Sequence, residues 1–176
     1  MDKNWKAIIW HQFGAAIDML DNALSACPDE LWQEHLYDER SVQPAFAEFW
    51  YVAYHTLFWL DFYLSDSIET FSPPPPFTLS EFEAGLLPER VYTKAELQMY
   101  LKYGRNKCKQ TIENLTDALV PQRCRTDWPE MSVAELWLYN MRHVQEHAAQ
   151  LSLFLGQKEG SPSAWVPKAK SSKSDA

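Results

Sequence analysis

The chain has 176 residues, enough for one domain, and 46% of them are hydrophobic, so a substantial core can form. Its formal net charge of −8 argues against binding to nucleic acid, which needs a dense Lys/Arg surface, and against docking on anionic membranes. No apolar stretch reaches the length of a membrane-spanning helix, and the N-terminus lacks the pattern of a signal peptide. We therefore expect a cytoplasmic protein whose cysteines, Cys27, Cys108 and Cys124, are free thiols.

Two helices are predicted in the first third of the chain. Residues 4–26 carry apolar side chains at helical spacing on one broad face. Residues 29–44 look irregular, and Pro44 is the last helix breaker before a second helix predicted over residues 45–64. This second helix is rich in aromatic side chains and apolar nearly all round, so we expect it to be the most buried one.

A long proline-rich connection follows the second helix. Its run of four prolines, Pro73–Pro76, cannot lie inside a helix and favours an extended polyproline conformation. A proline-rich recognition motif is one interpretation, but no other ligand-like repeat surrounds the run. We therefore expect a stiff crossover that extends to about Tyr92.

Two capping boxes mark the starts of the remaining helices, at Thr93 and at Ser132. We expect the third helix to extend through Leu119 and the fourth to end at Gly156. The link between them would then be short, which predicts that they are antiparallel neighbours.

These elements predict an all-α protein, a four-helix bundle over residues 1–156 with one long Pro-rich crossover between helices two and three. Residues 157–176 are rich in Ser, Lys and Pro, and we expect them to form a mobile C-terminal tail, although Trp165 could dock back onto the body.

Three of the five histidines form a candidate metal site. His143 and His147 are four residues apart, so they lie one turn above the other on the same side of the fourth helix. His55 lies in the middle of the apolar second helix, where an unsatisfied imidazole would be costly. A metal ion shared by the three would satisfy it, whereas a hydrogen-bonded core histidine is the alternative. Asn140 and Gln150 lie close to the histidine stripe and could orient a ligand imidazole.

Other sites are less favoured by the spacing. The order His143-Val144-Gln145-Glu146-His147 lacks the glutamate of a zincin motif beside the first histidine, so we interpret Glu146 as a solvated carboxylate. No histidine has a glutamate three residues before it, which argues against a di-iron bundle. We expect His11 and His35 to lie on the surface.

Two segments resemble the DinB/YfiT-like family of metalloenzymes. One is Arg40-Ser41-Val42 leading into FWYVAYHTLFWLDFYL, and the other is MSVAELWLYNMRHVQEHAAQLSLFLG. The resemblance covers about residues 4–156 and implies an up-down-down-up bundle, often a homodimer. It also implies that His55, His143 and His147 bind zinc or nickel, and that a low-molecular-weight thiol such as mycothiol or bacillithiol is a candidate substrate.

The sequence leaves the function open between an enzyme and a non-catalytic module. A three-histidine metal site with an open position would support thiol transfer or hydrolysis, with Tyr51, Tyr139 and Asn140 as candidates for further roles by position only. Alternatively, the chain is a metal-binding stress-response module, or a helical interaction protein without metal.

Overall fold

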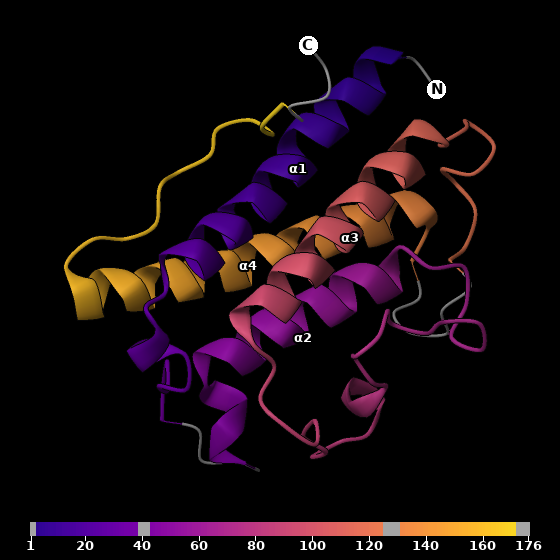
Figure 1. Ribbon diagram of the computed structural model, residues 1–176. Coiled ribbons are helices and arrows are strands. Elements are labelled where there is room, and N and C mark those ends of the chain that lie inside the picture. Colours follow the sequence, from indigo (N-terminus) through magenta and orange to yellow (C-terminus); the bar gives the residue numbers. More distant parts are fainter. Residues whose placement is uncertain (1–2, 39–42, 125–130, 172–176) are drawn as a thin grey trace.

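Four α-helices make up the body of the protein, in a computed structural model that describes residues 3–38, 43–124 and 131–171. The helices are α1 (Lys3–Ala26), α2 (Phe49–Tyr63), α3 (Lys94–Glu113) and α4 (Val133–Glu159). Three short 3₁₀ turns lie in the connections: η1 (Asp29–Leu31), η2 (Pro44–Ala47) and η3 (Ser80–Phe82). No strand occurs within the described residues, and the predicted all-α four-helix bundle is confirmed (Figure 1).

Each helix packs mainly against two others, which gives the order α1, α4, α2, α3 around the bundle. In Figure 1, α1 and α4 run in one sense while α2 and α3 run in the opposite sense, an up-down-down-up path. The neighbours α2 and α3 are therefore parallel, and a parallel pair needs a connection that carries the chain back to its starting end. Residues 64–93, with the proline run, form that connection.

Three helix boundaries differ from the prediction. α2 begins at Phe49 rather than residue 45, because the preceding residues form the 3₁₀ turn η2 and leave Glu48 extended. α3 ends at Glu113 rather than near residue 119, and α4 continues to Glu159. Because α3 is shorter, the link to α4 is longer than expected. In addition, α3 packs mainly against α1 and α2. The prediction that helices three and four are neighbours is therefore wrong.

Both predicted capping boxes are present. Thr93 Oγ1 accepts a hydrogen bond from the Glu96 backbone N–H at 3.3 Å, and the Glu96 carboxylate accepts one from the Thr93 N–H at 2.8 Å. Ser132 and Glu135 form the same pair of bonds, at 3.3 and 2.9 Å. These bonds satisfy N–H groups that the first turn of a helix leaves unpaired, so α3 and α4 begin where the sequence predicts.

The helix α2 is enclosed on nearly every side, as its composition predicts. Every residue of α2 is buried except His55 and Trp59, which lie one turn apart. These two side chains mark the side of α2 that faces the cavity described below. Despite this apolar helix, no helix among the described residues has the length and composition needed to cross a membrane.

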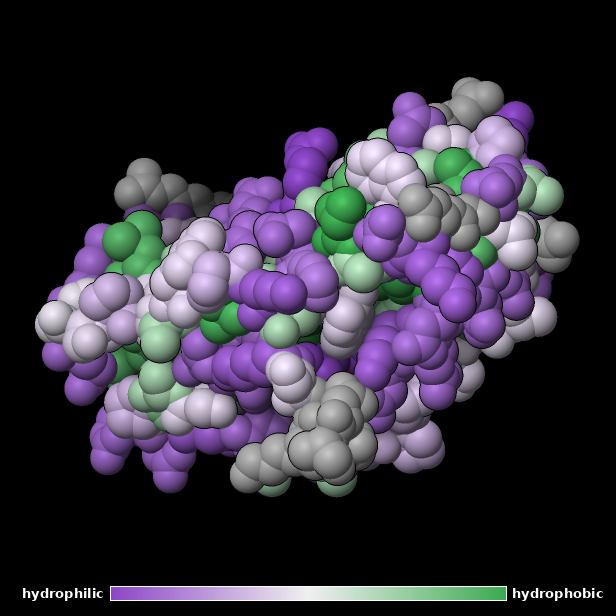
Figure 2. Space-filling model, turned by 90° about the horizontal axis from the view of Figure 1, so that it is seen from above, coloured by the Kyte–Doolittle hydropathy of each residue, from purple (hydrophilic) through white to green (hydrophobic). Residues whose placement is uncertain are grey.

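The described part of the C-terminal tail lies against α1, and the mobility expected for this tail stays a prediction. Gly160 ends α4 with a φ of 74°, a left-handed conformation that suits glycine, and the chain then runs back along α1 (Figure 1). The Ala169 N–H donates to the His11 carbonyl at 2.9 Å. A Cβ at Gly14 would lie 2.7 Å from Ala169 Cβ, so the tail approaches α1 at a position without a side chain. Figure 2, which shows the molecule from above, shows a face that is mostly hydrophilic with scattered hydrophobic patches.

Asp18 links three parts of the chain, and we expect its loss to destabilise the fold. It is 3% exposed, and its carboxylate accepts hydrogen bonds from Arg105 of α3 at 2.8 Å and from the Lys170 N–H of the tail at 2.6 Å. The change Asp18→Ala leaves the guanidinium without its partner, so we expect the free energy of unfolding in urea to fall by about 3 kcal/mol.

Asp29→Ala provides the control for this measurement. The Asp29 side chain is 95% exposed and pairs with Lys94 at 3.2 Å, so its removal should change stability far less. Equal losses of unfolding free energy in the two variants would show that the buried contacts of Asp18 stabilise the fold no more than the exposed pair of Asp29 and Lys94.

Candidate metal centre

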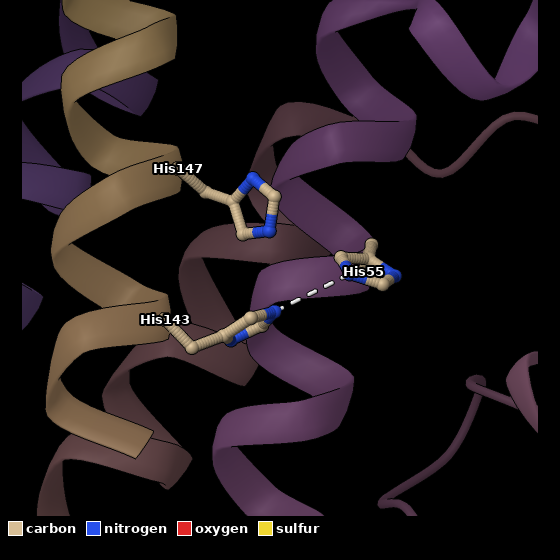
Figure 3. Close-up of side chains that lie close together, drawn as sticks. All are labelled: His55, His143 and His147. Carbon is tan, nitrogen blue, oxygen red and sulfur yellow. Dashed lines mark hydrogen bonds between the residues drawn. The ribbon is translucent and has the colours of Figure 1, made fainter. Parts of the chain in front are cut away.

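Three histidine side chains point toward one another in the space between α2 and α4 (Figure 3). His55 comes from α2, and His143 and His147 come from successive turns of α4. One ring nitrogen of each lies within 4.8 Å of the others, and the Nε2 atoms of His55 and His143 are 3.3 Å apart. The structure thus brings together the three residues that the sequence singled out, at a spacing that one metal ion can bridge.

Glu81 fixes the orientation of His55 and was missed by the sequence analysis. It lies in η3, within the crossover, and its Oε2 is 2.7 Å from His55 Nδ1. The same oxygen accepts a hydrogen bond from Trp59 Nε1 at 2.8 Å, and Oε1 accepts one from the Tyr51 hydroxyl at 2.5 Å. Burial acts to raise the pKa of Glu81, but the hydrogen bond and charge of His55 outweigh it and hold this pKa below its usual value. The group is therefore a carboxylate.

Gln150 plays a similar part for His147. Its Oε1 lies 2.8 Å from His147 Nδ1, one helical turn away on α4. An amide oxygen only accepts hydrogen bonds, so His147 carries its hydrogen on Nδ1 and leaves the lone pair of Nε2 free. The prediction that Gln150 orients a histidine of this cluster is borne out by this contact.

The second ring nitrogen of His143, Nδ1, differs from those of His55 and His147. Within the described part of the chain, neither this buried atom nor Asn140 Oδ1, one turn earlier on α4, has a hydrogen-bond partner. The other end of the Asn140 amide donates to the Leu60 carbonyl at 3.1 Å, which anchors this side chain in the core. Asn140 was a candidate for a role at the site, and the structure places it behind His143 rather than in the cavity.

These contacts fit a divalent metal ion. Because Glu81 can only accept, His55 also carries a hydrogen on Nδ1, and in the neutral ring the Nε2 lone pair then points toward His143 Nε2. At this distance either a hydrogen on His143 Nε2 or a shared cation can occupy the space that the His55 lone pair faces. Metal-binding histidines in proteins commonly have their second nitrogen engaged in this way.

The electrostatics of the cluster also favour metal binding over protonation. Burial lowers the pKa of His143 to about 2, and the charges of His147 and His55 act in the same direction. Burial and the charge of His55 lower the pKa of His147 as well. Both rings are therefore neutral imidazoles at neutral pH, which is the form that coordinates a metal.

The histidines line one side of a cavity of about 480 Å³. Its walls are largely aromatic, and they come from α2, α4, the segment before α2 and the end of the crossover. The residues that line it are Tyr37, Phe46, Tyr51, Val52, His55, Trp59, Tyr63, Glu81, Glu83, Ala84, Gly85, Leu86, Tyr139, His143 and His147. A small molecule that enters this space can reach the three imidazoles.

The other sequence candidates lie elsewhere or have other roles. His35 is exposed and lies 3.8 Å from Glu48, while His11 is half-buried on α1. Glu146 is exposed, in agreement with its interpretation as a solvated carboxylate. The motif over residues 40–42 lies outside the described residues. The cysteines are buried, and burial raises the pKa of the Cys27 thiol to about 12, so this thiol is a poor nucleophile.

Fold and site together define a helical bundle with a histidine cluster between its second and fourth helices. The family model of the DinB superfamily matches residues 12–151, a stretch that contains all three histidines and Glu81. The chain therefore belongs to the DinB superfamily. Comparisons with curated proteins and with solved structures gave no match.

The contact between Glu81 and His55 predicts a measurable effect on metal affinity. Replacing Glu81 by glutamine removes the negative charge and places an amide beside three hydrogen-bond donors. We expect the affinity for Zn²⁺, measured by competition with a chromophoric chelator, to fall about 10- to 100-fold. Glu83→Gln is the matched control, because Glu83 lies in the same loop but is exposed. An unchanged affinity in Glu81→Gln would contradict the assigned role.

Proposed function

We propose that this protein is a metal-dependent enzyme that binds one divalent ion, zinc or nickel, through His55, His143 and His147. The observation that carries the proposal is the meeting of these three imidazoles at the wall of a cavity. Catalytic zinc sites have three protein ligands, whereas structural ones are closed by four. Among the described residues, no fourth His, Cys, Asp or Glu side chain joins the cluster, which favours an enzyme over a structural site.

The bound ion would lower the pKa of a thiol or a water and so supply a nucleophile at neutral pH. The residues of the chain orient and enclose the reactants. Glu81 holds His55 and places one negative charge beside the cluster. Burial, together with the charge of Glu81, raises the pKa of Tyr51, and burial, together with Tyr139, raises the pKa of Tyr63. Both hydroxyls therefore stay protonated and serve as hydrogen-bond donors, not as bases.

Thiol transfer is the first candidate reaction and hydrolysis the second. Glu81 is a poor general base, because its pKa lies below its usual value and both of its oxygens already accept hydrogen bonds from other side chains. A thiol that the ion activates needs no such base, so we favour a low-molecular-weight thiol as the substrate. The homodimer and the cytoplasmic location expected from the sequence stay predictions.

Metal content provides the first test of the proposal. We expect about one zinc or nickel ion per chain in protein purified without a histidine tag, measured by mass spectrometry. His55→Ala and His143→Ala should both lose the ion yet stay helical by circular dichroism, because the core packs without it. His35→Ala is the control and should keep the ion, since His35 lies outside the cluster. No metal after incubation with zinc and nickel would sink the enzyme hypothesis.

A thiol-transfer assay tests the reaction itself. Metal-loaded protein is mixed with a panel of low-molecular-weight thiols and an aryl halide, from which the thiol displaces halide ion to form a thioether that absorbs light. We expect turnover that disappears after chelation and in His143→Ala, and that returns when metal is restored to the wild type. A rate that does not depend on metal would contradict the thiol-transfer proposal and leave hydrolysis as the candidate.

A further inference from the structure

We propose that the cavity beside the three histidines selects small molecules with an uncharged, ring-bearing body attached to a thiol or a similar metal-binding head group. This inference rests on the proposed function, because the head group would be held at the histidine cluster. It goes further by naming the part of the substrate that the chain itself recognises. The composition, packing and charge of the cavity walls carry it.

Aromatic side chains continue the row of histidines on both helices. On α2, Tyr51, His55 and Trp59 follow one another at intervals of four residues, with ring centroids 6.5 and 6.2 Å apart. Trp59 is followed by Tyr63, at 5.3 Å, and Tyr63 meets Tyr139 of α4 edge-on at 5.4 Å. The two rows therefore join into one aromatic wall beside the imidazoles.

Other aromatic and apolar side chains border the same cavity. Phe46, just before α2, packs 4.8 Å from the ring of Tyr51, and Tyr37 also lines the cavity. Leu86, 45% exposed, adds an apolar side chain from the crossover. A ring bound in this cavity would lie beside several aromatic side chains, with which edge-to-face and offset contacts are the preferred arrangements. The volume of about 480 Å³ is typical of a small-molecule site.

The aromatic rings that line the cavity differ from those that fill the core. Phe58 and Phe62, also on α2, are buried and pack against Phe82 of the crossover at 5.1 and 5.0 Å. Trp59 and Tyr139 are only half-buried, and they border the cavity. Trp59 also packs against Phe82, at 5.9 Å, but like Tyr139 it keeps part of its ring exposed toward the cavity.

The charges around the cavity disfavour an anionic body. Its described lining residues include two carboxylates, Glu81 and Glu83, and no lysine or arginine. Tyr51, His55 and Trp59 all donate hydrogen bonds to the Glu81 carboxylate, which fixes this negative charge at the cavity wall. Away from the proposed metal ion, a negatively charged body would meet these carboxylates without a compensating lysine or arginine, whereas an uncharged ring would avoid this repulsion.

The experiment compares two thiols on cobalt-substituted protein. Ethanethiol and 2-phenylethanethiol share the same head group, and the second carries one additional ring. We expect 2-phenylethanethiol to bind at least about tenfold more tightly, measured from the thiolate-to-cobalt absorption, because the ring is removed from water. Tyr139→Ser should remove most of this preference. Leu138→Ser is the matched control, since Leu138 is 55% exposed on another face of α4.

Equal affinities of the two thiols for the wild type, or an unchanged preference in Tyr139→Ser, would overturn the inference. If ethanethiol binds the cobalt protein but 2-phenylethanethiol binds no more tightly, the proposed function survives and the assignment of the cavity fails. If no metal binds, the proposed function fails, and saturation-transfer NMR of 2-phenylethanol on metal-free protein still tests the cavity. A phenyl signal that Tyr139→Ser abolishes would then support the assignment, and no signal would overturn it.

Discussion

The parallel packing of α2 against α3 is the constraint on which the candidate site depends. Parallel neighbours cannot be joined by a tight turn, so the chain must return across the bundle through residues 64–93. That return places η3 beside α2 and brings Glu81 to within hydrogen-bonding distance of His55. The same segment supplies part of the cavity wall. The long connection is thus a component of the site as well as a link between helices.

Burial then decides how each polar group at the site behaves. An imidazole in the middle of an apolar helix is costly unless its nitrogens are satisfied, and Glu81 satisfies one nitrogen of His55. Glu81 is itself stabilised by Tyr51 and Trp59 on the same helix. On α4, burial keeps His143 neutral and Gln150 orients His147. Together these contacts fix the orientations of His55 and His147 and leave His143 and His147 neutral, which is the form of imidazole that can coordinate a cation.

The successes and failures of the sequence-based prediction have physical causes. The caps at Thr93 and Ser132 are local, since they involve residues three apart, and both were predicted correctly. The end of α3 was not, because a helical pattern continued to residue 119 although the chain leaves the helix at Asn114. Glu81 was missed because nothing in the sequence distinguishes it from Glu83, and only long-range packing brings one of them to His55.

The sequence by itself determined that four helices form and that α2 is buried, because hydrophobic periodicity is a local property of the chain. It also singled out His55, His143 and His147 as candidate metal ligands, and the four-residue spacing of His143 and His147 is likewise local. Tertiary structure decided which helices are neighbours, how the tail lies on α1 and which groups orient the histidines. These depend on contacts between residues far apart in sequence, such as Glu81 with His55 or Lys170 with Asp18, which only the packing of the bundle brings together.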